Sequence, residues 1–183
     1  KRKIMFPFDA NKLNHLMNEE GVNLLLATTR HNVRYLTGGY YYHFHVNATR
    51  MGQTQYLPFV GLPGGRLEEA FFVCRAEERG QIEAAVPWIQ QRVDAMRGTL
   101  PAAESAITTI RKLGLTEGTI VVELPFLPAD AFRALQHGLP KARLVDATPI
   151  LDELRAVKTP AELAHLRTVY DRVAEAIQAG FAA

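Results

Sequence analysis

Residues 22–39 read VNLLLATTRHNVRYLTGG, and they carry the clearest signal for the fold class. The apolar run over residues 22–27 has the length and flanks of a strand that is buried on both faces. Residues 29–36 then predict a short helix, which the glycines Gly38 and Gly39 would end. A buried strand that leads directly into a helix is typical of an α/β layered fold.

On the N-terminal side of this stretch, the sequence predicts another helix. Asp9 can cap its start, and Gly21 can end it. Its apolar face would comprise Leu13, Leu16 and Met17. This helix would precede the buried strand and cover one side of it.

On the C-terminal side, two strands are expected to form a hairpin. Residues 56–62 and 70–74 read as strands, and residues 63–65, Pro-Gly-Gly, read as the turn between them. An antiparallel hairpin beside parallel strands makes the sheet mixed. The pattern over residues 77–96 then predicts a mostly helical segment that is broken near Pro87.

The alternation continues through the second half of the chain. Pro101 favours the first position of a helix, and Gly114 would end that helix. The remaining elements expected are a strand over residues 119–122, a helix over residues 128–135 and a strand over residues 143–145. This order predicts an α/β fold: a three-layer α/β/α arrangement with a mixed β-sheet, ending in a C-terminal linker helix.

The linker helix has the sharpest local signal. Residues 159–162, Thr-Pro-Ala-Glu, form a capping box with proline at the first helical position. Apolar residues then recur at helical spacing: Leu163, Leu166, Val169, Tyr170, Val173 and Ile177. We therefore expect one domain over residues 1–156 and a linker helix over residues 157–183. A helix with no later element to cover it favours a chain cut from a longer protein, but folding back or dimerisation would also cover it.

Composition and charge limit the possible functions. Hydrophobic residues make up 48% and charged residues 22%, as in ordinary globular domains. The net charge of +2, with both signs interspersed, offers no electrostatic basis for binding nucleic acid or membrane. No apolar run approaches the ~20 residues that span a bilayer, and no signal peptide is visible. We expect a cytoplasmic protein without nucleic-acid or membrane partners.

Motifs for catalysis and metal binding are missing from the sequence. It contains no Ser/His/Asp arrangement, no His-Glu-x-x-His and no glycine-rich nucleotide loop. His43 and His45 could begin a metal site, but no third ligand has a fitting spacing. The single cysteine, Cys74, excludes a disulfide within the chain and reads as an inert core thiol. We therefore expect neither a metal nor another cofactor in this chain.

Three patches of the sequence resemble the creatinase, prolidase and aminopeptidase P family. Residues 32–38, NVRYLTG, resemble the turn that follows the family's first strand. Residues 121–123 and 127–129 resemble a later strand and helix. Residues 149–163, PILDELRAVKTPAEL, resemble the junction before the catalytic domain. The matching junction residues are Arg155, Lys158, Thr159, Pro160, Glu162, Leu166 and Arg167. The resemblance covers nearly the whole chain, in the family's order.

This resemblance implies a two-domain parent in which the present chain is the N-terminal domain. The "pita-bread" catalytic domain would follow, and in peptidase members it holds two divalent metals (Mn, Co or Zn). A metal-dependent Xaa-Pro dipeptidase or aminopeptidase is the expected parent; a creatinase-type amidinohydrolase, which works without metal, is the second reading. The expected partners are the chain's own C-terminal catalytic domain and a second copy in a homodimer.

The resemblance also implies a role for residues 40–50. In creatinase-like members, an aromatic residue and an arginine from this region reach the active site of the neighbouring subunit. Phe44 and Arg50 are the nearest equivalents, and His45 lies beside them, so these three are the expected substrate-contacting residues in trans. An arginine can bind a carboxylate through two hydrogen bonds, and an aromatic wall excludes water. The alternative is a surface loop whose tyrosines pack at a subunit interface.

We therefore expect no catalytic residues in this chain and no activity from it alone. Its expected role is oligomerisation and the shaping of substrate access in a Xaa-Pro peptidase or creatinase-like hydrolase. A rival hypothesis is the N-terminal domain of a pseudoenzyme relative, used to bind peptides or proteins. A third is a complete small α/β binding domain. Fold alone does not separate these functions.

Overall fold

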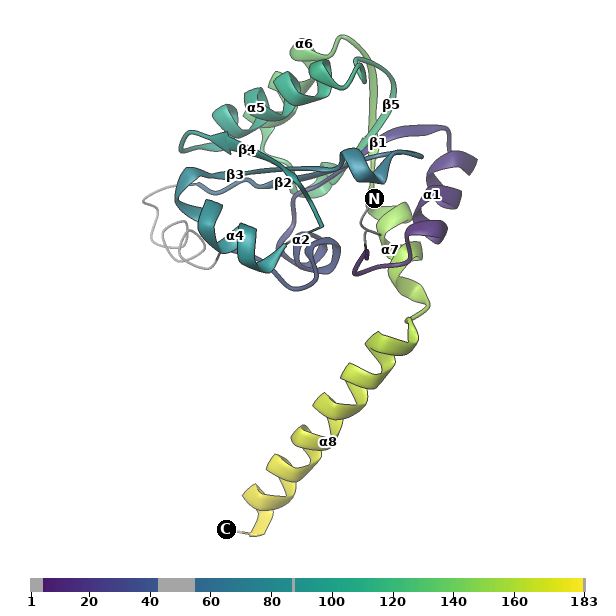
Figure 1. Cartoon of the computed structure of the whole chain (residues 1–183), viewed down its shortest axis with the longest axis vertical. Coiled ribbons are helices and arrows are strands. Elements are labelled where there is room, and N and C mark those ends of the chain that lie inside the picture. The colour runs from purple at the N-terminus through teal and green to yellow at the C-terminus, as the bar shows by residue number, and fades with distance from the viewer. Residues whose placement is uncertain (1–4, 43–54, 87, 183) are drawn as a thin grey trace.

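A six-stranded mixed sheet forms the centre of the molecule (Figure 1). The computed structural model describes residues 5–42, 55–86 and 88–182. The sheet has the order β4-β3-β2-β1-β5-β6, and β2 alone runs antiparallel to its neighbours. The strands are β1 (Val22–Ala27), β2 (Phe59–Pro63), β3 (Phe71–Arg75), β4 (Gln91–Ala95), β5 (Glu117–Val122) and β6 (Lys141–Asp146).

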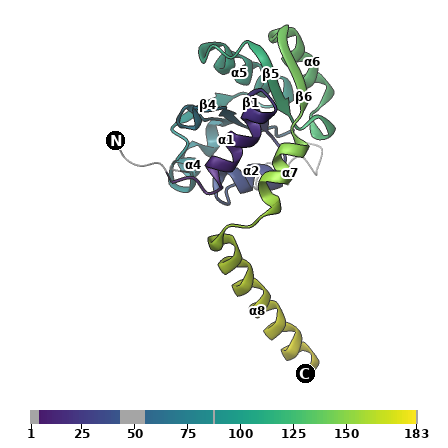
Figure 2. The same cartoon turned by 90° about the vertical axis from the view of Figure 1, so that its right-hand side faces the viewer.

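Helices cover both faces of the sheet, which confirms the three-layer α/β/α prediction (Figures 1 and 2). One face packs against α1 (Ala10–Glu19), α2 (Arg30–Thr37), α4 (Arg79–Ala85) and α7 (Thr148–Ala156). The opposite face packs against α5 (Thr99–Lys112) and α6 (Ala129–Gly138). The last helix, α8 (Pro160–Ala182), runs away from this body.

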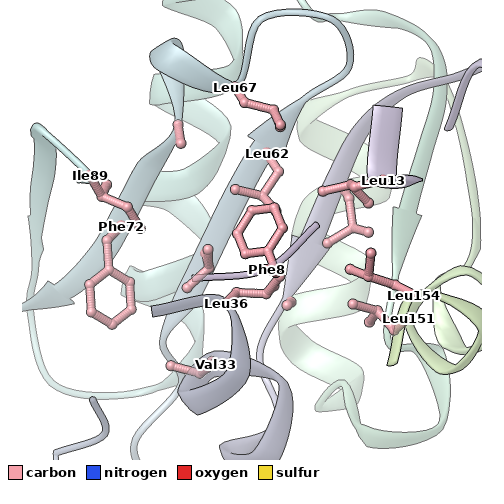
Figure 3. Packing of buried hydrophobic residues seen from close by; sticks show 14 of the residues in the cluster. Phe8, Leu13, Val33, Leu36, Leu62, Leu67, Phe72, Ile89, Leu151 and Leu154 are labelled. Atoms are coloured by element: carbon pink, nitrogen blue, oxygen red, sulfur yellow. The ribbon is translucent and has the colours of Figure 1, made fainter. Parts of the chain in front are cut away.

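Side chains of the central strands alternate between two hydrophobic cores because successive residues of a strand point to opposite faces. Leu25 of β1 and Phe72 of β3 lie in the first core, whereas Leu24 and Phe71 lie in the second. Figure 3 shows the first core, where side chains from α1, α2 and α7 converge on β2 and β3. Both cores are closed to water, so the central strands read as continuous apolar runs rather than alternating ones.

The predicted hairpin is present as β2 and β3, which pair antiparallel. The connection between them is longer than a simple turn, because it includes the 3-10 helix η1 (Leu67–Glu69). Within the hairpin, Gly61 lies opposite Phe71, and a Cβ added at Gly61 would come within 2.2 Å of the Phe71 ring. The ring of Phe71 therefore lies across the space that any side chain at position 61 would need.

The helix-end signals before and after β1 are also confirmed. The carboxylate of Asp9 accepts a hydrogen bond from the backbone N–H of Lys12 at 2.9 Å, which caps α1. Gly38 has φ +80°, the left-handed conformation that glycine adopts at low cost, and it ends α2. These local rules position both ends of the β1–α2 unit.

The prediction of a mostly helical segment over residues 77–96 is wrong in its second half. Among the described residues of this segment, the 3-10 helix η2 (Ala76–Glu78) and α4 are helical, whereas Gln91–Ala95 form strand β4, which pairs parallel with β3. This strand lies at the edge of the sheet and is only partly buried, so Gln91, Arg92 and Asp94 are tolerated in it. A further helix, α7, was not predicted from the sequence, and it packs against α1.

The predicted capping box is present at the start of α8. The Glu162 carboxylate accepts the Thr159 N–H at 2.7 Å, and the Glu162 N–H donates to the Thr159 hydroxyl at 3.2 Å. Just before it, the Lys158 ammonium donates to the carbonyls of Arg155 and Ala156 at 2.6 and 3.0 Å, at the C-terminal end of α7. Polar contacts therefore complete both helix ends at the junction, and α8 is confirmed as a C-terminal helix.

Candidate functional site

The neighbouring parallel strands β1 and β5 have their carboxyl ends side by side, at the same end of the sheet. From there β1 leads into α2 on one face, whereas β5 leads through the 3-10 helix η3 (Leu124–Phe126) to α6 on the opposite face. In open α/β sheets, such a switch point is the usual place for a bound ligand. The carboxyl ends of β1 and β5 are therefore the first candidate for a functional site.

Glu123 fills this switch point with a carboxylate from the protein itself, and it is only 1% exposed. One of its oxygens accepts the backbone N–H groups of Thr28 at 2.5 Å and Thr29 at 2.8 Å. The other accepts the Thr29 hydroxyl and the Asn32 amide, both at 2.6 Å. The start of a helix attracts anions, and here the anion is Glu123. That position is consequently not open to an anionic ligand.

The same contacts join two of the sequence patches that carry the family resemblance. Asn32 belongs to the first patch and Glu123 to the second, and their side chains bind each other directly. Thr37 of the first patch donates its hydroxyl to the Val33 carbonyl at 2.6 Å, and the same oxygen accepts the N–H of Tyr40 at 3.1 Å. These residues fix the geometry of β1, α2 and β5, which is an architectural role.

A second buried carboxylate, Glu78, lies just beyond the end of β3. One oxygen accepts the backbone N–H of Arg75 at 2.7 Å, and the other accepts the hydroxyls of Tyr40 and Tyr56, each at 2.8 Å. Burial raises the pKa of Glu78, and the three hydrogen bonds oppose that rise. Burial and the neighbouring Glu78 raise the pKa of both tyrosines. Both hydroxyls therefore stay protonated and act as hydrogen-bond donors.

A pocket of about 320 Å³ has walls that both carboxylates hold in place. Thr28 and Thr29, which bind Glu123, line one part, and Tyr56, which binds Glu78, lines another. The ring of Tyr41 packs edge-on against Tyr56, with ring centroids 5.5 Å apart. The pocket thus combines aromatic walls with fixed polar edges, as small-molecule sites commonly do.

The three predicted substrate-contacting residues, Phe44, His45 and Arg50, lie outside the described residues, as does His43. The structure therefore does not test the predicted contacts in trans or the histidine pair. It does place the chain on either side of them. Tyr40 precedes residues 43–54 and Tyr56 follows them, and both bind Glu78.

The histidines of the described ranges have ordinary surroundings. His15 pairs with Glu19 along α1 at 3.3 Å, and the His31 ring packs edge-on against Phe126. Nδ1 of His137 lies 2.8 Å from the carbonyl of Arg133. Within residues 5–42, 55–86 and 88–182, no three His, Cys, Asp or Glu side chains gather in a way that could hold a metal ion.

Cys74 lies in β3 and is buried, as the sequence predicted. Burial, with the nearby Glu78 and Asp94 carboxylates, raises the pKa of its thiol to about 12. The reactive thiolate is therefore almost absent near neutral pH. These surroundings make the thiol inert and do not support a nucleophilic role.

A larger cleft of about 830 Å³ lies at the junction of α2, α7 and α8. Its lining includes Arg34 and Tyr35 from α2, Arg155 from α7, and Glu162 and His165 from α8. Burial and the nearby Glu162 raise the pKa of Tyr35 to about 12, so its hydroxyl is a donor at neutral pH. The cleft opens where the body meets the projecting helix.

Helix α8 exposes its entire length, and none of its residues is buried. The apolar residues of its predicted stripe are between about one third and two thirds exposed: Leu163, Leu166, Val169, Tyr170, Val173 and Ile177. Phe181 near its end is 90% exposed. An amphipathic helix normally buries such a stripe against another element. In the described part of the chain, no helix has the length and apolar character needed to cross a bilayer.

Comparisons with known proteins bear on this arrangement. The family model described as "Creatinase/Prolidase N-terminal domain" matches residues 10–157. No curated protein matches the chain by sequence. Among solved structures, a dipeptidase from Pyrococcus horikoshii is similar with a TM-score of 0.65 and 19% identity. The match covers 92% of this chain and 43% of that one.

Two further structures show how much of a longer relative and of an isolated domain this chain matches. A Xaa-Pro dipeptidase from Bacillus anthracis matches with a TM-score of 0.61 and 15% identity, over 84% of this chain and only 37% of that one. A "Creatine_N Superfamily domain" of a Streptococcus thermophilus dipeptidase matches with a TM-score of 0.58 and 20% identity, over 79% of this chain and 98% of that one. The chain thus spans less than half of each of the two longer relatives and nearly all of the isolated domain.

Proposed function

Because the chain belongs to the creatinase/prolidase N-terminal domain family, we propose that it serves as the non-catalytic N-terminal domain of a metal-dependent Xaa-Pro dipeptidase or aminopeptidase. Its work in that enzyme is to support assembly into a homodimer and to shape access to the active site. The chemistry belongs to a second domain, where two divalent metals would activate water and polarise the scissile carbonyl.

The exposed stripe of α8 is the observation that carries this proposal. Leu166, Val173 and Ile177 lie on a helix that has no covering partner in the described chain. A helix of this kind gains most of its stability from packing its apolar side. The two longer dipeptidases have more than half of their length beyond the match with this chain. We propose that the corresponding catalytic domain covers α8 here.

The second part of the proposal concerns residues 40–50. Phe44, His45 and Arg50 contact the substrate bound in the partner subunit, where the arginine takes a carboxylate and the aromatic side chain excludes water. The supporting observation is that Glu78 binds Tyr40 and Tyr56, which lie on either side of residues 43–54 in the sequence.

The test compares the 183-residue chain with a longer protein that carries the catalytic domain. With Mn²⁺, Co²⁺ or Zn²⁺ present, the short chain should not hydrolyse Xaa-Pro dipeptides, and the longer protein should. Light scattering should show the longer protein as a dimer. Hydrolysis by the short chain would overturn the proposal. A longer protein that binds proline-containing peptides without cleaving them would favour the pseudoenzyme hypothesis.

Substitutions in α8 test the proposed contact separately. Val173→Ser should lower the unfolding temperature of the longer protein and leave that of the short chain nearly unchanged, because the stripe is covered only in the former. Arg172→Ser, one residue earlier on the same helix, is the matched control and should have little effect in either. Equal effects of Val173→Ser on both proteins would contradict packing of α8 against a second domain.

A further inference from the structure

Strand β4 forms one edge of the six-stranded sheet (Figure 1). Within the described residues it pairs only with β3, so its other side carries no strand. A pocket of about 540 Å³ at this edge is lined by β4, by α5 and by Met96, whose side chain is 77% exposed. An open edge of this kind can pair with a strand of another chain.

The sequence of β4, Gln-Arg-Val-Asp-Ala over Gln91–Ala95, is complementary to itself in charge. If a second β4 pairs with it antiparallel about Val93, Arg92 lies opposite Asp94 of the second copy, and Asp94 lies opposite Arg92 of that copy. Residues that lie directly opposite each other share a face of the sheet, and opposite charges in such pairs stabilise it. Pairing about Arg92 or Asp94 instead places like charges opposite each other. The charges therefore favour pairing about Val93.

Arg92 has no carboxylate partner within the described chain. Its side chain is half-buried, its Nη2 lies a long 3.4 Å from the Val86 carbonyl, and its Nε is buried without a hydrogen-bond partner. Partly buried arginines usually have a countercharge. Asp94 differs, because it binds the guanidinium of Arg79 while its side chain stays 38% exposed. An Asp94 carboxylate from a second copy would supply the countercharge that Arg92 lacks.

Helix α5 extends this complementarity beyond the strand. Glu104, Thr108 and Lys112 recur at intervals of four along α5 and line the same pocket. The Ser105 hydroxyl donates to the Asp94 carbonyl at 3.3 Å, which holds this part of α5 beside β4. A two-fold axis at the centre of β4 would run α5 antiparallel to its copy, with the Glu104 end of each helix beside the Lys112 end of the other.

The spacing of the sheet permits this approach of the two helices. Neighbouring strands lie about 4.8 Å apart, and α5 packs over β3 and β4. Two copies of α5 would therefore lie roughly 10–15 Å apart across a joined edge, which is close to the distance between packed helices. Long charged side chains can meet over that distance.

We propose that β4 is the surface through which two copies of this chain join, antiparallel and centred on Val93, so that one continuous sheet runs through both. The partner is a second copy because the charges of β4 and α5 complement their own copies. The proposal deepens the homodimer part of the proposed function by naming its surface. The joining itself needs only this chain and no catalytic domain.

Charge reversal in the 183-residue chain tests this proposal. Sedimentation over a range of concentrations should show the wild type in equilibrium between monomer and dimer. Arg92→Asp and Asp94→Arg each place like charges opposite each other at two points, so each should weaken dimerisation by about ten-fold or more. Arg133→Asp, at an exposed position of α6, is the matched control and should dimerise like the wild type. Circular dichroism checks that each variant is folded.

Mixing the two reversed chains gives the sharper result. In a heterodimer of Arg92→Asp with Asp94→Arg, both pairs across the edge again have opposite charges. The mixture should therefore form heterodimers although each variant alone is largely monomeric. A general loss of stability in either variant would not be repaired by mixing, so this measurement separates pairing from folding.

Cross-linking locates the contact independently. Val93→Cys should form a disulfide between two copies under mild oxidation, because Val93 would lie opposite its own copy at a Cβ distance of about 5 Å. The native Cys74 is buried and should not compete. Val173→Cys in α8 tests the rival contact through the exposed apolar stripe and should form much less of the disulfide.

Three results would overturn the proposal. A wild-type chain that stays monomeric at every concentration would mean that the charges of β4 only shield the edge from other strands. A mixture of the two reversed chains that forms no heterodimer would rule out pairing of Arg92 with Asp94. Cross-linking through Val173→Cys but not Val93→Cys would place the contact on α8. Hydrolysis of Xaa-Pro dipeptides by the longer protein is independent of all three, so failure here is distinct from failure of the proposed function.

Discussion

Helices α5 and α8 have the same kind of amphipathic sequence and opposite environments. Seven of the 14 residues of α5 are buried, and Ile107 and Ile110 sit in the second core. None of the 23 residues of α8 is buried, although its apolar residues recur at the same helical spacing. A periodic pattern therefore specifies which side of a helix needs a partner. It does not say whether that partner lies in the same stretch of chain.

The largest expected effect separates the two helices directly. Ile110→Ala in α5 should lower the free energy of unfolding by about 2–5 kcal/mol, because it leaves a cavity in a closed core. Val173→Ala in α8 should change it by less than about 0.5 kcal/mol in the 183-residue chain, because its side chain is already half exposed. Urea unfolding measures both. A large effect at Val173 that grows with protein concentration would mean that α8 pairs with a second copy.

The next effect concerns polar groups, which the body buries and α8 does not. Glu123→Gln keeps the size of the side chain but turns one acceptor oxygen into a donor that faces the N–H and hydroxyl donors around it. We expect a loss of about 1–3 kcal/mol in urea unfolding. Glu68→Gln at an exposed position is the control and should cost little. If Glu123→Gln left the free energy of unfolding unchanged, water would have to replace the lost acceptor.

A smaller effect is expected at the start of α8, where local capping rather than packing holds the helix. Thr159→Ala removes one half of the capping box and should destabilise the first turn of α8 by about 1 kcal/mol. Amide hydrogen exchange at Leu163 should quicken, while exchange in β1 and β5 stays the same. Thr168→Ala within the helix should not weaken it, because alanine is the better helix former. Faster exchange throughout the body would contradict a purely local role.

The smallest expected effect is a dependence on pH that belongs to the body. Burial raises the pKa of Glu78 above the ordinary 4.5, so the folded chain holds this proton more tightly than the unfolded chain. The resulting contribution to stability is complete below about pH 4.5 and is lost as the pH rises through the raised value. Glu78→Gln should flatten the pH dependence of urea unfolding in that window. An identical pH profile for wild type and variant would show that Glu78 titrates normally.

Much of the fold followed from the sequence because local signals and burial agree in it. The central strands are apolar on both faces, and the ends of α1, α2 and α8 use standard caps. Strand β4 was mistaken for helix because an edge strand needs few apolar residues, and Gln91–Ala95 has few. The exposed edge of a sheet leaves little trace in sequence.

The candidate site was less accessible to sequence reasoning. Glutamates are usually exposed, so nothing local marks Glu78 and Glu123 as buried. The two tyrosine partners of Glu78 lie 38 and 22 residues away, and the partners of Glu123 lie more than 90 residues away. The one available signal was that Glu123 and Asn32 belong to separate patches of the same family resemblance. Its meaning as a direct contact required the structure.

The contact between Gly61 and Phe71 has a consequence for how this sequence can change over evolutionary time. A side chain at position 61 would meet the ring of Phe71 at 2.2 Å, so a larger residue there is acceptable only if position 71 becomes smaller. The two positions can drift together but not separately. Substitutions at these sites in descendants of this protein should therefore appear as correlated pairs, and a lone replacement of Gly61 should be purged by selection.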